Sequence, residues 1–190
     1  METQTQIQLI QAVQSGDTTS FGALYDEYVR DIYRFIYYKT HQKEVSEDLT
    51  SHVFMKALEK IQSFKGEKGM FRGWLYQIAR NTVIDYYRTQ KKTDNIEDAW
   101  DISSDDDVEQ EVNKQFDKEE LRKYLSQLKS EQRDIILMRL WQDMSYEEIA
   151  LALGKSESNC RVTFSRGIAQ LRKIMPLALL LLFLFDHPLR

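Results

Sequence analysis

The 190-residue sequence is poor in the residues that mark several functional classes. It has one cysteine, so no intramolecular disulfide can form, and its three scattered histidines show no Cys/His spacing of a zinc site. We find no glycine-rich phosphate loop, no G-x-S-x-G signature and no isolated carboxylate pair, so we expect no enzyme, no cofactor and no small-molecule substrate. The N-terminus lacks a basic segment followed by an apolar run, which predicts no signal peptide and a cytoplasmic location.

Residues that interrupt helices are also scarce, because the chain has seven glycines and two prolines. This composition favours an all-α protein with one large or two small helical domains. The net charge of -4 hides a strong segregation, since acidic residues dominate 93–120 while basic residues prevail in 65–92 and 121–175. The acidic stretch has few large apolar residues, which indicates a flexible linker. We therefore predict a helical bundle over 1–92, an acidic linker over 93–120, a second helical domain over 121–175 and a tail over 176–190.

Residues 144–172 have the pattern of two short helices joined by a tight turn. Ser145 and Glu148 match the S-x-x-E capping box at the start of the first helix. Gly154 stands where a left-handed residue would end that helix, and Ser156 can cap the second helix, which carries several cations. The spacing predicts a helix-turn-helix, whose second helix enters the DNA major groove. An ordinary helical hairpin with a solvated basic face is the competing interpretation.

Small residues in this region are interpreted as packing residues. Cys160 falls on the apolar side of the second helix with Phe164 and Leu171, so we expect it to be buried rather than to act as a redox sensor. Ala150 is expected to let the two helices approach closely.

The N-terminal part shows further helical patterns. Apolar residues at three- and four-residue steps from Phe21 to Ile36 predict a core helix that follows Asp17 and Thr18. Ser46 is expected to cap a second helix over 47–61. On the side of this helix away from its apolar stripe the sequence places Asp48, Ser51, Met55, Lys56 and Glu59.

A third helix, after the loop 65–69, mixes cations with aromatic rings on its polar side. Such interleaving suits single-stranded DNA, since rings stack on bases at about 1–3 kcal/mol each while Arg and Lys follow the phosphates. A core role for each ring is the competing interpretation, because aromatic residues at helical spacing more often pack inside. The predicted apolar side is Phe71, Leu75, Ile78, Thr82 and Tyr86, and the polar side is Arg72, Tyr76, Arg80, Asn81, Tyr87, Arg88 and Lys91.

Together these segments resemble the extracytoplasmic-function (ECF) group of bacterial sigma factors. The resemblance begins at FGALYDEYVRDIYRFIY, continues through EDLTSHVFMKALEKI and FRGWLYQIARNTVIDYYR, and returns at LKSEQRDIILMRL and MSYEEIALALG. It implies two helical domains that bind core RNA polymerase and recognise two promoter elements, so that the protein directs promoter melting and transcription initiation. It implies core RNA polymerase and promoter DNA as partners, and leaves open whether an anti-sigma factor holds the protein inactive.

Carried over by position, the resemblance implies three contact surfaces. The helix 47–61 resembles the surface that docks on the polymerase clamp, with Asp48, Leu49, Phe54 and Lys56 as contacts. The loop 65–70 and the third helix resemble the part that opens the minus-ten element, with Asn81, Asp85 and Arg88 near bases, Lys65, Lys68, Arg72 and Arg80 near phosphates, and Tyr76 as a further contact. The helix after Ser156 resembles the reader of the minus-thirty-five element, with Ser156, Ser158, Asn159, Arg161 and Thr163 near the groove and Arg166 and Lys173 at phosphates.

The sequence departs from the family pattern at three places. The family often has Gln-Glu where Ser51 and His52 stand, an arginine at Thr163, and a proline or small turn residue at Ser156. The base preference of the family is therefore not transferred to this chain.

The competing function is a helix-turn-helix repressor or activator that does not dock on polymerase. It would explain the C-terminal domain but would leave the helix 47–61 and the third helix without a task. A dimerising repressor would also need a coiled-coil seam or a ligand pocket, and the sequence shows neither.

The tail contains a nearly pure apolar run, Leu177 to Phe185. It is too short to span a bilayer, which needs about 20 apolar residues, so we expect no integral membrane protein. Three interpretations stay open: the run packs on its own domain, docks a regulator, or contacts a membrane surface.

Overall fold

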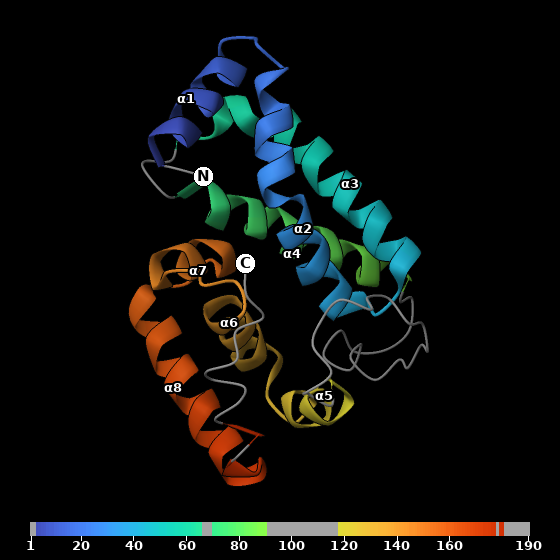
Figure 1. The fold of residues 1–190 in the computed structure, drawn as a ribbon, viewed down its shortest axis with the longest axis vertical. Helices are drawn as coiled ribbons and strands as arrows, with labels where there is room; N and C mark the ends of the chain where they lie inside the picture. The colour runs from blue at the N-terminus through green and yellow to red at the C-terminus, as the bar shows by residue number, and fades with distance from the viewer. Residues whose placement is uncertain (1–2, 66–69, 91–117, 178, 181–190) are drawn as a thin grey trace. The chain divides into compact units, whose positions relative to one another are not determined.

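The computed structural model describes residues 3–65, 70–90, 118–177 and 179–180, and within these ranges it contains eight α-helices, one 3₁₀ turn and no strand (Figure 1). This confirms the all-α prediction. The chain divides into two units, one built mainly from residues 1–106 and the other mainly from 107–190. Most of the predicted linker 93–120 lies outside the described residues, although α5 (Lys118–Ser126) begins inside that range. The exact domain boundaries stay predictions.

The N-terminal unit is a bundle in which α2, α3 and α4 pack on one another and α1 packs on α2 and η1 (Figure 1). The apolar stripe predicted from Phe21 to Ile36 is buried except for Tyr25, which is 40% exposed, and Leu24, Ile32 and Leu75 are fully inaccessible to solvent. The predicted core helix is thus confirmed. The elements are α1 (Thr3–Gln14), α2 (Ser20–Thr40), α3 (Lys43–Lys60), η1 (Ile61–Ser63) and α4 (Met70–Gln90).

The sequence patterns left α1 unassigned, yet this helix is tied to the rest of the unit. The Nε2 atom of Gln14 donates hydrogen bonds to the carbonyl oxygens of Ile61 (2.8 Å) and Phe64 (2.9 Å). The side chain of Gln62 donates in return to the carbonyl of Gln14 (3.0 Å). Because Phe64 directly precedes Lys65, α1 helps to fix the chain that leads toward α4.

The prediction that Ser46 caps its helix is wrong. The helix α3 begins at Lys43, after an extended Gln42, and Ser46 lies inside it. The buried Ser46 hydroxyl donates to the carbonyl of Gln42 (2.6 Å) and lies 2.7 Å from the hydroxyl of Thr40. A serine whose hydroxyl bonds the carbonyl one turn earlier can sit within a helix. Here it joins the end of α2 to the first turn of α3.

The C-terminal unit consists of α5, α6 (Ser130–Leu140), α7 (Tyr146–Leu153) and α8 (Glu157–Ile174). The helices α6 and α8 pack closely at Gly167, where an added Cβ would lie 2.7 Å from Cδ1 of Ile136 and 3.3 Å from Cβ of Gln132. The close approach expected at Ala150 stays a prediction, and no local pattern predicted the contact at Gly167. Gly167 therefore sets the separation of α6 and α8.

The described part of the tail is short. The amide of Leu180 donates to the carbonyl of Pro176 (3.0 Å), and Leu180 is buried whereas Leu177 is 70% exposed. Residues 178 and 181–185 of the predicted apolar run lie outside the described residues, so the three interpretations of the tail stay open. Among the helices of the described ranges, none combines the length and hydropathy needed to cross a bilayer.

Candidate nucleic-acid and polymerase interface

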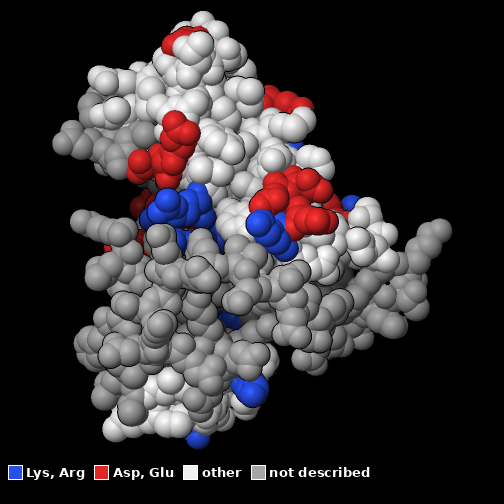
Figure 2. All heavy atoms as spheres, turned by 45° about the vertical axis from the view of Figure 1, so that its right-hand side comes forward, with Lys and Arg blue, Asp and Glu red and all other residues white. Residues whose placement is uncertain are grey.

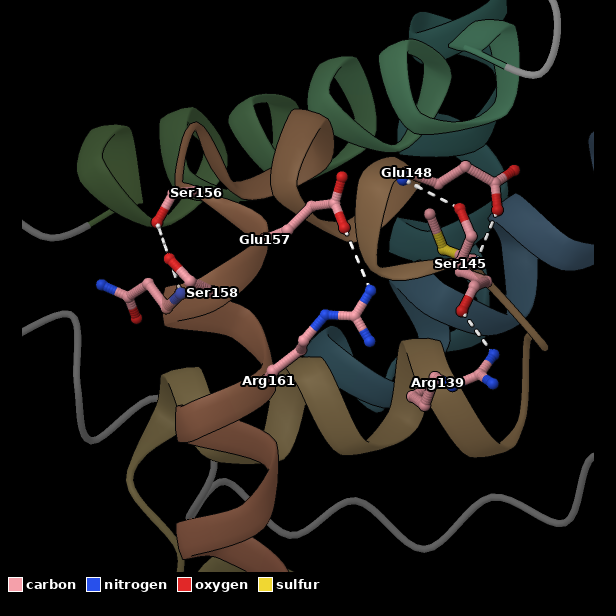
Figure 3. A network of polar contacts seen from close by, with 9 residues as sticks. Arg139, Ser145, Glu148, Ser156, Glu157, Ser158 and Arg161 are labelled. Atoms are coloured by element: carbon pink, nitrogen blue, oxygen red, sulfur yellow. Dashed lines mark hydrogen bonds and ion pairs between the residues drawn. The ribbon is translucent and has the colours of Figure 1, made fainter.

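The predicted capping groups at the start of α7 and at the start of α8 are present (Figure 3). The Ser145 amide donates to a carboxylate oxygen of Glu148 (2.7 Å), and the Glu148 amide donates to the Ser145 hydroxyl (3.1 Å), which completes the capping box. Gly154 has a φ of +65°, and the Ser156 side chain accepts a hydrogen bond from the amide of Asn159 (3.3 Å). The local sequence alone therefore dictates where α7 begins and where α8 begins.

The second helix presents most of its predicted contact residues to solvent. Cys160 and Leu171 are fully buried, as predicted for Cys160, and burial raises the pKa of the Cys160 thiol. Thr163 is half-buried and donates to the side-chain oxygen of Asn159 (3.1 Å). The exposed predicted residues are Ser156, Ser158, Asn159, Arg161, Arg166 and Lys173.

Two neighbours on this surface were not selected from the sequence. Val162 is 48% exposed on α8, although a single apolar residue among cations gave no reason to choose it. Glu157 forms an ion pair with Arg161, with 3.1 Å between their nearest atoms. The four-residue spacing of that pair is readable from sequence and could have been found.

The contact residues predicted on α4 have unequal environments. Arg88 and its partner Asp85 lie 3.1 Å apart with side chains 71% and 50% exposed, and Asn81 is also exposed. Arg72 is mostly buried and pairs with Asp31 of α2 at 3.6 Å, and Arg80 is half-buried. Lys65 is exposed, and Lys68 lies outside the described residues.

Tyr76 was predicted to lie on the polar side of α4, and this prediction is wrong. Its side chain is fully buried, and its ring packs edge-on against Phe35 with 5.1 Å between ring centroids. The helix α4 packs on both α2 and α3, so its buried surface is wider than the apolar stripe suggested. Tyr76 therefore serves the core and is not available to a base in this structure.

Other rings near α4 also make contacts within the protein. Phe64, Phe71 and Trp74 form a cluster with centroid separations of 5.0–5.6 Å. The Tyr87 hydroxyl donates to the carbonyl of Lys39 (2.7 Å), and burial, with a smaller contribution from Tyr86, raises the pKa of Tyr87 to about 12. These contacts favour a packing role for much of the aromatic content.

The polymerase contacts predicted on α3 divide in the same way. Leu49 and Phe54 are buried, and the Phe54 ring lies 4.7 Å from that of Tyr25, so neither side chain is open to a partner here. They belong to the side of α3 that packs in the bundle. The Lys56 ammonium donates to the Thr82 hydroxyl (3.2 Å), which ties it to α4. The exposed positions on this helix include Asp48, Ser51, His52, Met55 and Leu58.

Charged side chains of both signs lie close together on part of the described surface. On the face drawn in Figure 2, Lys and Arg side chains of the described residues lie beside groups of Asp and Glu. With a net charge of -4, attraction to DNA has to come from local groups of cations rather than from the average charge.

The C-terminal unit contains a capped helix-turn-helix, and a second helical bundle with exposed polar residues on α3 and α4 precedes it. This combination is typical of a DNA-binding protein of transcription. Residues 24–93 match the family Sigma-70 region 2, and residues 118–171 match Sigma-70, region 4. The RNA polymerase sigma factor YlaC of Bacillus subtilis is 35% identical over 160 residues, which cover 82% of this chain and 92% of YlaC. The ECF RNA polymerase sigma factor SigX of the same organism is 34% identical over 165 residues, covering 83% and 84% of the two chains.

The chain therefore belongs to the ECF RNA polymerase sigma factors, a family that binds core RNA polymerase and directs promoter recognition. This confirms the resemblance seen in the sequence and does not favour the repressor. Among solved structures, the sigma factor RpoE of Bartonella quintana in complex with the anti-sigma factor NepR superposes with a TM-score of 0.67 over 83% of this chain and 98% of that one. At 22% identity that likeness supports the fold alone.

Proposed function

We propose a division of labour among three helices of this sigma factor. The exposed side of α3 docks on core RNA polymerase, α4 engages the opened minus-ten element, and α8 reads the minus-thirty-five element as duplex. The observation that carries the proposal is the joint presence of a region 2 unit and a capped helix-turn-helix, each with exposed contact residues. A repressor would need only the second of these units.

The proposed docking face consists of Asp48, Ser51, His52, Met55 and Leu58, which are all exposed on α3. Met55 is 59% and Leu58 is 37% exposed, so an apolar strip lies beside the charge of Asp48. Apolar contact surrounded by polar groups is typical of protein interfaces. In this proposal Leu49 and Phe54 support the face from inside the bundle, and Lys56 lies at its edge.

For α4 we assign Asn81, Asp85 and Arg88 to bases of the opened strand, because these three stand near its C-terminal end and are at least partly exposed. Lys65, Lys68, Arg72 and Arg80 are assigned to phosphates. An extruded base has to be held by hydrogen bonds and by cations along the backbone, and these residue types supply both.

For α8 we assign Ser158, Asn159 and Arg161 to base edges, because residues in the first turns of a recognition helix enter the major groove. Ser156 caps the helix, Thr163 supports Asn159, and Arg166 and Lys173 are assigned to phosphates. Phosphate contacts fix the position of the helix, whereas base contacts carry the sequence preference.

The proposal includes no catalysed reaction and no cofactor, and it places the protein in the cytoplasm, where core polymerase transcribes the chromosome. We also infer that an anti-sigma protein regulates it. This inference goes beyond the shared fold: the similarly folded RpoE was solved in complex with the anti-sigma factor NepR, and we extend that mode of regulation to this chain as a proposal.

The experiment that tests this function compares the free chain with the chain bound to core polymerase. Two small DNA-contacting units bind weakly until a larger partner fixes both, which raises the effective concentration of the second contact. We expect weak, strongly salt-dependent promoter binding by the free chain and tight, promoter-specific binding with core polymerase.

A substitution on the docking face links that result to α3. Asp48→Arg should lower affinity for core polymerase and reduce run-off transcription, while the DNA binding of the free chain stays unchanged. The matched control is Asp26→Arg, which makes the same charge reversal at an exposed position of another helix, α2. Tight sequence-specific binding by the free protein, without co-purification of polymerase, would contradict the proposed function.

A further inference from the structure

The guanidinium of Arg161 is held by two groups of its own domain. Its carbon Cζ lies 4.4 Å from the centroid of the Tyr146 ring, and one of its nitrogens lies 3.1 Å from a carboxylate oxygen of Glu157. Figure 3 shows Arg161 and Glu157 pointing toward each other along α8. The Arg161 side chain is nevertheless 59% exposed, so it is oriented without being buried.

The Tyr146 ring is itself supported by the residues around it. Tyr146 is the first residue of α7, directly after the capping residue Ser145. Its ring meets Phe164 of α8 edge-on, with 6.0 Å between centroids, and the guanidinium of Arg139 lies 5.4 Å from its centroid. A ring with neighbours of this kind has little freedom to turn.

Arg139 is fixed by contacts of its own. It donates to the carbonyl of Met144 (2.8 Å) and pairs with Asp143 at 3.5 Å, at the end of α6. Arg139 is therefore committed to the α6–α7 connection, whereas the exposed Arg161 can still meet a ligand. Of the two cations on this ring, only Arg161 stands in the first turns of the recognition helix.

An aromatic ring that contacts the face of a guanidinium restricts the orientation of the guanidinium plane. The N–H groups of the guanidinium stay available for hydrogen bonds. Arginine donates in the plane of the guanidinium, and the cation–π contact uses only the face. Orienting the side chain before binding reduces the conformational entropy that would otherwise be lost when two parallel hydrogen bonds form. The acceptor pair that fits this geometry in the major groove is O6 and N7 of guanine.

We propose that Tyr146 is a positioning residue for promoter reading, which orients Arg161 toward a guanine edge and so determines base preference at one position. This rests on the proposed function, in which α8 reads the minus-thirty-five element. Glu157 contributes to this preference, because its carboxylate accepts a hydrogen bond from Arg161 until a guanine takes its place as the acceptor. Acceptors weaker than guanine then compete poorly with Glu157.

The test uses holoenzyme assembled from core polymerase and the full chain, with promoters carrying each of the four bases at every minus-thirty-five position. Arg161→Ala should remove a preference for guanine at one position. Tyr146→Leu should reduce that same preference about three- to tenfold, whereas Tyr146→Phe, which keeps the ring, should retain it. The control, Arg166→Ala, removes an exposed cation elsewhere on α8 and should weaken all promoters alike.

Double variants separate positioning from general weakening. Tyr146→Leu should have no further effect on base preference in the Arg161→Ala background and its full effect in the Arg166→Ala background. A measurement on the wild-type chain covers the case in which Tyr146→Leu does not fold: the side-chain protons of Arg161 should show an upfield ring-current shift in NMR spectra.

The outcomes distinguish this inference from the function on which it rests. Uniform loss across promoters in Arg161→Ala would overturn the reading role of Arg161 and with it the inference. A lost preference in Arg161→Ala combined with an unchanged preference in Tyr146→Leu would overturn the positioning role alone. Additive effects of Tyr146→Leu and Arg161→Ala, or the absence of a ring-current shift on Arg161, would also refute it.

Discussion

The helices α4 and α8 each carry an exposed arginine that is proposed to meet DNA, and each arginine is paired with an acid one turn earlier on its own helix. Arg88 pairs with Asp85 and Arg161 with Glu157, both at 3.1 Å. The two arginines differ in whether an aromatic ring contacts the guanidinium group. Tyr146 lies under Arg161, whereas within the described part of the chain no ring lies under Arg88 in this way.

This difference fits the two kinds of DNA that the helices are proposed to meet. A duplex base edge has one fixed geometry, so an arginine oriented in advance has an advantage. An opened strand is pliable and can adjust to the protein, so an arginine that retains its freedom suffices. The rings of α4 are used in packing, whereas the ring of Tyr146 packs against Phe164 and also contacts the functional side chain of Arg161.

The largest effect should follow from removing a packed ring of α4. Tyr76→Ala should lower the free energy of unfolding of the N-terminal unit by about 3–5 kcal/mol, the range for truncating a buried aromatic residue. Val162→Ala on exposed α8 should change stability by less than about 0.5 kcal/mol. Hydrogen exchange on the full chain resolves the two units. Unchanged protection in α2 to α4 with lost promoter binding would return Tyr76 to the DNA surface.

The next largest effect should distinguish opening of the promoter DNA from binding of the closed promoter. Arg88→Ala should remove about 1.5–3 kcal/mol of charged hydrogen bonding, which is roughly a tenfold or larger loss of open complex. Permanganate reactivity of thymines in the minus-ten region should fall while polymerase affinity stays unchanged. Lys173→Ala should instead weaken closed-complex binding on all promoters alike. If both variants lost closed complexes only, the proposed distinction between α4 and α8 would be wrong.

A smaller effect is expected when each of two helical glycines is replaced by alanine. Gly22→Ala on α2 meets open space and should stabilise its unit by up to about 1 kcal/mol. Gly167→Ala gains the same propensity, but its Cβ would lie 2.7 Å from the buried Ile136, and overpacking costs about 1–3 kcal/mol. A net loss is therefore expected. The rate at which a thiol reagent labels buried Cys160 reports opening of the C-terminal unit, and slower labelling in Gly167→Ala would contradict the packing described.

The smallest effect should come from the acidic partners. An exposed ion pair contributes about 0.2–1 kcal/mol, so Glu157→Gln should raise promoter affinity by no more than about fivefold, and less at high salt. For Asp85→Asn, loss of the base contact assigned to Asp85 opposes the release of Arg88, so a small net fall in affinity is expected. Glu157→Gln leaves Arg161 on its ring and should weaken discrimination against bases other than guanine. Competition binding with single-base promoter variants measures both. A fall in affinity for Glu157→Gln would show that this acid itself contacts DNA.

Local signals were sufficient where the determinants lie close together in sequence. Ser145 with Glu148, Gly154 and Ser156 act within a few residues of one another, so the α7–α8 turn was predictable. Tyr76 could not be placed correctly from periodicity, because burial on two sides of α4 depends on how α2, α3 and α4 pack. The Tyr146–Arg161 contact joins residues 15 positions apart and depends on the angle of the turn, which no periodicity encodes.

The contacts of Gln14 have a consequence for the order in which the protein is made. Their partners, Ile61 and Phe64, lie 47 and 50 residues further along the chain. These contacts of Gln14 therefore cannot form during synthesis until α2, α3 and η1 have followed α1 out of the ribosome. Bringing such distant ends together has an entropic cost that assembled α2 and α3 reduce. The hydrogen bonds that tie α1 to the end of α3 and η1 thus form only after residue 64 has emerged.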